Sequence, residues 1–396
     1  MSYFNQINFN PANMSAFGDL VVAENTPVIQ LDFVYGINSQ LGAVTTANSA
    51  TGDTNLGRLR LQSGTNIAGN ASFSSARPAK YRQGQGITSR FTAAFTTGVA
   101  TSTQIAGMGN ANDGYFFGYN GTSFGILHRN SGTGSLVNTW TAQASWNGSI
   151  PSGFDPTKGN VCMIRYPFLG YGDVEFFLQD STSGQMFLVH TIRYANTVTT
   201  IQLSNPNLFF FAQSINEGAA TNQIVYVGSV GVFLNGVRLF LGPTYGTANR
   251  KATITTQTSV LALRNATTYN TLTNRSLIRI KSISVAWDGA NDTCQLNVIK
   301  NPTLGGSPSY AAINGTTGDS GVTITSGNSV ASVDTAGTTI TGGIIQFNFS
   351  AARNTGFFLD VSSFDLFIEP ASIMAFAITG DSSGTARVSV NWVEDI

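Results

Sequence analysis

Charge is what this sequence has least of. Only 10% of its 396 residues are Asp, Glu, Lys or Arg, against about a quarter in ordinary globular proteins. The 20 basic and 20 acidic residues cancel, so the formal net charge at pH 7 is zero. Nucleic-acid binding needs a basic face, and net charge keeps free proteins apart in solution. The composition therefore excludes a nucleic-acid partner and favours a protein that works within an assembly.

Cysteine and histidine are almost as scarce, with two of each. Cys162 and Cys294 lie far apart in the chain, so we expect buried free thiols rather than a metal or redox pair. No CxxC, HExxH, P-loop or dinucleotide motif occurs. Asn110, Asn112 and Asp113 could offer oxygens to Ca²⁺, but the same GNANDG segment reads equally as a plain loop. We expect no metal and no cofactor.

Long hydrophobic runs are also missing. No apolar stretch approaches the roughly 20 residues of a membrane-spanning helix, and the start, MSYFNQINFNPANMS, has neither a basic nor an apolar signal region. We therefore expect no membrane partner and no signal peptide. No segment has a convincing helical period either, so the helix content should be low.

Apolar and turn-forming residues are abundant instead. The chain is 42% hydrophobic and 11% aromatic, and it contains 43 glycines. Short segments of alternating apolar residues, separated by Gly, Asn and Pro turns, are typical of an all-β sandwich or jelly roll. We predict strands at 28–36, 57–61, 90–97, 160–168, 173–179, 185–194, 208–212, 224–233 and 237–241, and further strands beyond residue 252.

One aromatic hairpin is the centre of this pattern. In Asp113–Arg129, DGYFFGYNGTSFGILHR, apolar residues alternate on both sides of Asn120-Gly121, the preferred pair of a type I′ turn. Because neither face could stay bare in water, the hairpin must pack against a second sheet or another subunit.

The chain divides into three predicted parts. Residues 1–75 are a polar N-terminal arm with a strand, 76–245 a jelly roll, and 246–396 a second, smaller β-sandwich. The boundary rests on Gly242-Pro243 and the polar run that follows to Lys251. The small polar stretch 307–343 is expected to form long loops or weak edge strands.

Two motifs resemble catalytic sequences but are incomplete. Gly318-Asp319-Ser320-Gly321 matches the nucleophile segment of chymotrypsin-like proteases, yet the triad's histidine is missing, because His128 and His190 lie in the other predicted domain. Asp173 and Glu175 put two carboxylates on one strand face, as in retaining glycosidases, but Phe177 occupies the position of the expected third carboxylate. We therefore predict no catalytic residues and no enzyme activity.

Aromatic side chains are the better candidates for a site. Tyr119, Trp140, Trp146 and Tyr171 lie near Gly/Asn turns and could stack on sugar rings, so they are the predicted glycan-binding residues. Packing at an interface explains the same enrichment in Trp and Tyr.

Several segments resemble a known family. Residues 91–98, 114–129 and 166–196 are similar to the concanavalin A-like lectin/glucanase jelly roll as it occurs in virion proteins of large DNA viruses and tailed phages. Residues 16–36 and 388–395 look like the companions of that module. The resemblance implies a concanavalin A-like sandwich and a virion structural role. It carries over no catalytic residues, because the glucanase carboxylate motif is incomplete.

The sequence therefore predicts a virion structural protein of the capsid, fibre or tail, made in the host cytoplasm. Its expected partners are other virion proteins, further copies of itself and a host surface glycan. The alternatives are a carbohydrate-binding lectin or adhesin and, third, a glycoside hydrolase on a jelly roll.

Self-association follows from the shortage of charge, and the viral resemblance suggests a trimer. Either part of the aromatic hairpin, through Tyr115, Phe117, Phe124 and Ile126, or the similar hairpin at 174–187 would lie near the subunit contact. The alternative is that the hairpin is wholly internal and the chain is monomeric.

Overall fold

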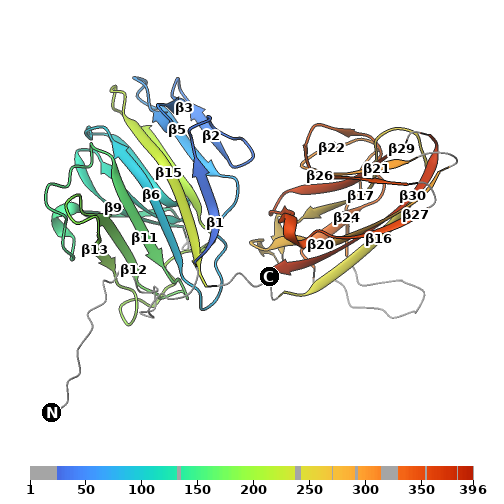
Figure 1. Cartoon of the computed structure of the whole chain (residues 1–396). Coiled ribbons are helices and arrows are strands. Elements are labelled where there is room, and N and C mark those ends of the chain that lie inside the picture. Colours follow the sequence, from blue (N-terminus) through green and yellow to red (C-terminus); the bar gives the residue numbers. More distant parts are fainter. Residues whose placement is uncertain are drawn as a thin grey trace, which may run out of the picture. The chain divides into compact units, whose positions relative to one another are not determined.

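The computed structural model describes residues 25–131, 135–236, 242–269, 271–289, 293–313, 329–352, 355–380 and 382–395. The chain divides into two compact units, residues 1–238 and 239–396 (Figure 1). Regular structure in the described residues is β-strand apart from the short 3₁₀ helices η2 (Gln143–Ser145) and η3 (Ser362–Phe364). The described residues include no helix that is long and apolar enough to span a membrane. The all-β prediction is confirmed.

An eight-stranded antiparallel sheet forms one layer of the first unit. Its strands, in spatial order, are β13 (Met186–Ile192), β12 (Val174–Gln179), β11 (Asn160–Tyr166), β6 (Ile87–Phe95), β15 (Ile224–Asn235), β4 (Arg58–Gln62) and β3 (Thr51–Asn55), and β1 (Asn25–Asp32) pairs with β15.

A seven-stranded antiparallel sheet forms the other layer. Its order is β10 (Val137–Ala142), β9 (Ser123–Asn130), β8 (Gly114–Asn120), β7 (Ser102–Gly109), β14 (Phe209–Asn216), β5 (Asn70–Ser75) and β2 (Gly42–Ala47). The chain passes repeatedly from one sheet to the other, as from β5 to β6 and from β10 to β11. This is the crossing pattern of a jelly roll.

Alternate residues of both sheets meet in one apolar core. Phe91 and Phe95 of β6 contribute from the eight-stranded sheet, and Phe117, Phe124 and Phe210 contribute from the seven-stranded sheet. Because successive strand residues point to opposite faces, the neighbours of these side chains face outward. The outward face of the seven-stranded sheet is the one that carries the site described below.

Residues 25–75 belong to this sandwich rather than to a separate arm. β1 pairs with β15, and β2 and β5 complete the seven-stranded sheet. The sequence predicted strands at 28–36 and 57–61, where the structure has β1 and β4, but it gave no sign of β2, β3 or β5. The predicted polar start, residues 1–24, lies outside the described residues.

The aromatic hairpin is confirmed as β8 and β9, but its turn differs from the predicted one. Asn120 pairs with Ser123, so the loop residues are Gly121 and Thr122. Gly121 has φ +59°, whereas Asn120 is not among the residues with positive φ. Glycine at the first loop position is the pattern of a type II′ turn. Asn120 therefore remains in the strand, where its side chain is exposed.

The four predicted interface residues lie inside the first unit. Tyr115, Phe117 and Ile126 are fully buried and Phe124 is 7% exposed, all within the sandwich core. The second sheet of the same chain covers them, so the structure does not support a subunit contact through this face. The internal alternative holds for the hairpin.

The second unit is a smaller sandwich of two main sheets. One contains β16 (Thr244–Ile254), β30 (Gly384–Asp395), β20 (Leu277–Gly289), β27 (Thr355–Asp360) and β28 (Phe367–Ile368); the other contains β23 (Ala311–Ala312), β24 (Ala331–Asp334), β17 (Thr258–Asn265), β29 (Ile373–Gly380), β21 (Cys294–Lys300) and β26 (Ile344–Ala351). Two short pairs, β18 (Thr268–Tyr269) with β19 (Leu272–Thr273) and β22 (Thr303–Leu304) with β25 (Ile340–Thr341), complete it.

The predicted linker is a strand of this second unit. The polar run after Gly242-Pro243 is β16, which pairs along its length with β30. β16 is an edge strand with much solvent exposure, so it carries few apolar residues. For that reason its sequence resembles a polar segment between domains. The division between the units falls at Arg238 and Leu239, seven residues before the predicted one. Cys162 and Cys294 are both buried and neither forms a disulfide, in line with the prediction.

Candidate functional site

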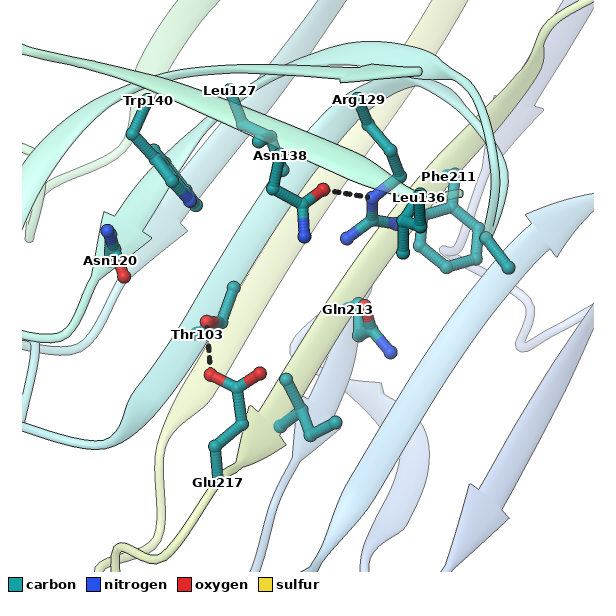
Figure 2. A pocket seen from close by; sticks show the side chains of 12 residues that line it. Thr103, Asn120, Leu127, Arg129, Leu136, Asn138, Trp140, Phe211, Gln213 and Glu217 are labelled. Atoms are coloured by element: carbon teal, nitrogen blue, oxygen red, sulfur yellow. Dashed lines mark hydrogen bonds between the residues drawn. The ribbon is translucent and has the colours of Figure 1, made fainter. Parts of the chain in front are cut away.

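A cavity of about 380 Å³ opens on the outward face of the seven-stranded sheet (Figure 2). It is lined by residues of five neighbouring strands and of the segments around them: Thr103, Ala111, Asn120, Leu127, Arg129, Leu136, Asn138, Trp140, Phe211, Gln213, Ile215 and Glu217. Its volume lies within the range of about 300–1,000 Å³ that small-molecule sites occupy.

A small apolar cluster underlies the cavity. It consists of Ile105, Phe116, Leu127 and Phe211, each at least nine-tenths buried, with the half-buried Trp140 packed against them. These side chains point away from the main core because their strand neighbours, such as Phe117, Ile126 and Phe210, point into it. The sheet is therefore apolar on both faces, and Trp140 stands at the boundary between this second cluster and the cavity.

Arg129 supplies a buried cation at the cavity wall. The side chain is only 7% exposed, and its guanidinium carbon lies 5.4 Å from the centre of the Phe116 ring. Its Nε donates to Oδ1 of Asn138 at 3.1 Å, and Nη1 donates to the carbonyl oxygen of Asn110 at 3.0 Å. Burial lowers the pKa of Arg129, and the charge of Glu217 partly opposes that shift. Arginine stays protonated at neutral pH all the same.

Glu217 is the one carboxylate among the described residues that line the cavity. Its Oε2 accepts a hydrogen bond of 2.8 Å from the Thr103 hydroxyl, and the side chain is exposed. Amide groups supply further donors and acceptors. Asn120 and Asn138 are exposed. Nε2 of Gln213 donates to Oδ1 of Asn70 at 3.0 Å, and the side-chain oxygen of Gln213 has no partner in the described contacts.

This arrangement suits recognition of a polar ring with an apolar face. An indole offers a flat apolar surface, while the guanidinium, amides and carboxylate fix the positions of hydroxyl or charged groups. Among the described residues there is no group of three or more His, Cys, Asp or Glu that could hold a metal ion.

Of the four predicted glycan-binding aromatics, Trp140 alone lines this cavity. Tyr119 is 7% exposed and packs on Phe124 inside the sandwich. Trp146 is 9% exposed, also in the core, and its Nε1 donates to the carbonyl oxygen of Thr141 at 3.2 Å. Both are covered and cannot stack on a ligand as placed. Tyr171 is 42% exposed, on the segment after β11, where its hydroxyl donates to the Thr199 carbonyl at 3.1 Å.

The polar residues of the site were not predicted. Each of the four lies two residues along the chain from another residue that lines the cavity: Arg129 from Leu127, Asn138 from Trp140, Gln213 from Phe211, and Glu217 from Ile215. That spacing places them on one face. Because both faces of these strands carry aromatic residues, the sequence did not reveal which face is outward.

The other candidates have structural roles. Glu175 forms an ion pair with the buried Arg165, whose Nε donates to Oε2 of Glu175 at 2.7 Å. Burial raises the pKa of Glu175. Asp173 accepts the backbone N–H of Tyr194 at 2.8 Å. This pair faces away from the cavity, on the eight-stranded sheet. The protease-like motif at 318–321 lies outside the described residues.

Two of the three residues considered for Ca²⁺ use side-chain oxygens within the protein. Oδ1 of Asn110 accepts the backbone N–H groups of Asn112 and Asp113 at 2.7 and 2.9 Å. Asp113 is buried and accepts hydrogen bonds from the backbone and hydroxyl of Ser204. Asn112 is exposed, and GNANDG is a loop closed by the side chain of Asn110.

The chain has the following similarities to known proteins. No protein-family model and no curated protein matches the sequence. Among the solved structures that resemble it is arcelin-5, a lectin-like defense protein from Phaseolus vulgaris, with 12% sequence identity over 54% of this chain and 100% of that chain and a TM-score of 0.35. The exoplasmic/lumenal domain of VIP36, in a Ca²⁺/Man3GlcNAc-bound form, has 9% identity over 55% of this chain and 93% of that chain and a TM-score of 0.35. A beta-1,3-glucanase from Mycobacterium marinum has 12% identity over 49% of this chain and 91% of that chain and a TM-score of 0.32.

At these TM-scores the likenesses carry no argument about ligand or activity, and each covers about half of this chain. The fold stands on the sheets themselves. The first unit is a two-sheet jelly roll of the kind that the concanavalin A-like resemblance implied, and the second is a smaller β-sandwich. The predicted fold class is confirmed in this sense.

Proposed function

We propose that the first unit is a carbohydrate-binding, lectin-like module and that the glycan occupies the cavity on the seven-stranded sheet. The observation that carries the proposal is the meeting of Trp140 with Arg129, Glu217 and three side-chain amides around a cavity of about 380 Å³. A sugar ring has C–H faces that suit an indole and hydroxyl groups that suit fixed donors and acceptors, and the volume is within the range of small-molecule sites.

The proposal is for binding without hydrolysis. Glycoside hydrolysis uses a pair of carboxyl groups on opposite sides of the scissile bond, about 5–10 Å apart. Glu217 has no carboxylate partner among the described residues that line the cavity. The pair suggested by the sequence, Asp173 and Glu175, is held by hydrogen bonds and an ion pair on the other sheet. A binding role therefore fits the cavity better than a hydrolytic one.

A glycan array probed with the full chain, followed by calorimetric titration of the best glycan, tests the proposal. We expect Trp140→Ala to weaken binding by about tenfold or more, because the stacking surface is lost. Trp140→Leu keeps an apolar cover over the underlying cluster and should weaken binding as well. Tyr171→Ala is the matched control, since Tyr171 is an exposed aromatic outside the cavity.

Two results would overturn the proposal. One is that no glycan on the array binds the folded wild-type chain. The other is that Trp140→Ala and Tyr171→Ala have the same effect on a glycan that does bind. Thermal unfolding of each variant shows whether a loss of binding comes from a loss of structure.

The finer prediction of a virion component with a host surface glycan as ligand stays a prediction. Its support is the low, balanced charge and the sequence resemblance, and the cavity adds only a place where a glycan would fit. The location in a virion likewise stays a prediction. Mass spectrometry of purified particles from a host that carries this sequence would test both.

A further inference from the structure

The guanidinium of Arg129 has more hydrogen-bonding capacity than the described residues use. It carries five N–H donors, and two of them have partners: Nε with Asn138 and Nη1 with the Asn110 carbonyl. Three donors, on Nη1 and Nη2, are left without a partner in the described contacts. The side chain as a whole is more than nine-tenths buried, but Nη2 is not a fully buried atom, so these donors are open to the cavity that Arg129 lines.

Its charge is also uncompensated by a direct ion pair. Glu217 is the nearest acidic influence on Arg129, but the carboxylate is hydrogen-bonded to Thr103. Figure 2 shows the two side chains at different parts of the wall, with dashed lines to Asn138 and Thr103 rather than to each other. A buried charge without a partner is costly, and the cost is offset when a bound anion pairs with it.

The orientation of the group is fixed before any ligand arrives. Asn138 holds Nε, the Asn110 carbonyl holds Nη1, and the Phe116 ring lies against the guanidinium at 5.4 Å. The remaining N–H groups are at the η end, which faces the cavity (Figure 2). Two parallel N–H groups match the two oxygens of a carboxylate or of a sulfate ester, and such forked pairs are among the stronger hydrogen bonds in proteins.

We propose that the cavity selects an acidic sugar, with the carboxylate or sulfate group of the sugar bound by the η nitrogens of Arg129. This inference rests on the proposed glycan-binding function and adds the class of glycan. Trp140 would stack on the ring while Arg129 binds its charged substituent. Glu217 lies on the same wall and repels an anion, so it limits the affinity.

Calorimetric titration of the full chain with matched saccharides tests this. The probes are tri-galacturonate, neutral galactotriose and galactose-6-sulfate, which separate a carboxylate from a sulfate ester and both from no charge. We expect tri-galacturonate or galactose-6-sulfate to bind about tenfold or more tightly than galactotriose, since charge-assisted hydrogen bonds are about twice as strong as neutral ones. The preference should weaken as salt is added.

Three variants assign the effect to Arg129. Arg129→Gln should abolish the preference for the acidic probes, and Arg129→Lys, which keeps the charge but loses the fork, should retain part of it. Glu217→Gln leaves Arg129 in place. Compared with the wild type, this variant should bind the acidic probe more tightly and should not bind the neutral probe more tightly. This last variant keeps the test valid even if substitution of the buried arginine unfolds the sheet.

The outcomes separate the two proposals. Equal binding of the acidic and neutral probes overturns this inference and leaves the glycan-binding function standing. An acidic preference that survives unchanged in Arg129→Gln also overturns it, because another group then reads the charge. Failure of every saccharide to bind the folded chain overturns the glycan-binding function itself.

Discussion

His128 shows how the interior of the first unit fixes a protonation state. Its Nε2 lies 2.8 Å from the carbonyl oxygen of Gln202 and must donate to it, so Nδ1 is left to accept from the Tyr194 hydroxyl at 3.2 Å. The ring also stacks on Tyr115 at 5.2 Å. Burial lowers the pKa of His128, although the Gln202 contact partly opposes this. The imidazole is therefore held neutral at neutral pH.

This burial predicts a pH dependence of stability. When the folded pKa of a histidine lies below its unfolded value, the folded state binds fewer protons, and stability is fully present above about pH 6.5 and is lost as pH falls through the folded pKa. We expect the free energy of unfolding to fall between pH 7 and pH 5, and to fall less in His128→Gln. The difference should be at most about 1.4 kcal/mol per pH unit, the value for one proton.

Urea unfolding at pH 7, 6 and 5 measures this difference. His190 also has a pKa lowered by burial, so His190→Gln should reduce the same pH dependence independently. Parallel stability curves for the wild type and His128→Gln would contradict the account of His128 given above.

At the same scale, the sequence predicted one residue of the candidate site and missed its charged members. Trp140 was predicted as an aromatic residue near polar turns, a criterion that also selected Trp146, which the structure buries in the core. Arg129 was not, because its significance lies in burial and unused donors, which depend on Phe116, Asn138 and Asn110 coming from three separate segments. A residue pattern along one strand contains no information about those partners.

Among the elements, strands with apolar alternation were predictable and polar strands were not. β8 and β9 place apolar residues at alternate positions (Tyr115, Phe117 and Tyr119, then Phe124 and Ile126), and these residues lie in the core. β5 instead reads NASFSS, with Ala71 and Phe73 inward and small polar residues outward. β16 is an edge strand of threonine, asparagine and basic residues. Both depend on a neighbouring strand for their hydrogen bonds, so tertiary pairing decides their structure rather than their own composition.

Close packing of β8 between β7 and β9 gives a test at the level of the element. A Cβ added at Gly118 would clash with the carbonyl oxygen of Gln104 on β7, whereas one added at Gly356 of β27 would meet nothing nearer than 3.9 Å. Neither glycine has positive φ. We expect Gly118→Ala to destabilise the protein by about 2 kcal/mol or more, as backbone shifts in packed sheets do.

Gly356→Ala is the matched control, with an expected effect within about 0.5 kcal/mol. Thermal and urea unfolding of both variants provide the measurement. Equal destabilisation by the two substitutions would contradict the close approach of β8 to β7.

For the whole molecule, the predicted self-association has lost the surface first assigned to it. The aromatic hairpin is covered by the second sheet of its own unit, so its apolar surface gives no reason to expect a partner there. The shortage of charge that motivated the prediction is unchanged. A homo-oligomer, and the trimer in particular, therefore stays a prediction that light scattering on the 41.8 kDa chain would test.

The division into two units is the property of the whole chain that the structure defines best. One apolar cluster, built around residues such as Phe176, contains side chains of the first unit, and another, built around Phe376, contains side chains of the second. Both phenylalanines are fully buried. Since each core is formed from one unit's own residues, we expect damage to one core to destabilise that unit and to leave the other unit folded.

Phe176→Ala and Phe376→Ala form a matched pair for this prediction. Each leaves a cavity in one core and should destabilise that unit by about 3–5 kcal/mol. Hydrogen exchange followed by mass spectrometry should show faster exchange in β8 and β11 for Phe176→Ala, and in β17 and β21 for Phe376→Ala, because local opening follows local stability. If either substitution accelerated exchange equally in both sets of strands, the two cores would form one cooperative unit, and the first unit would depend on the second for its stability.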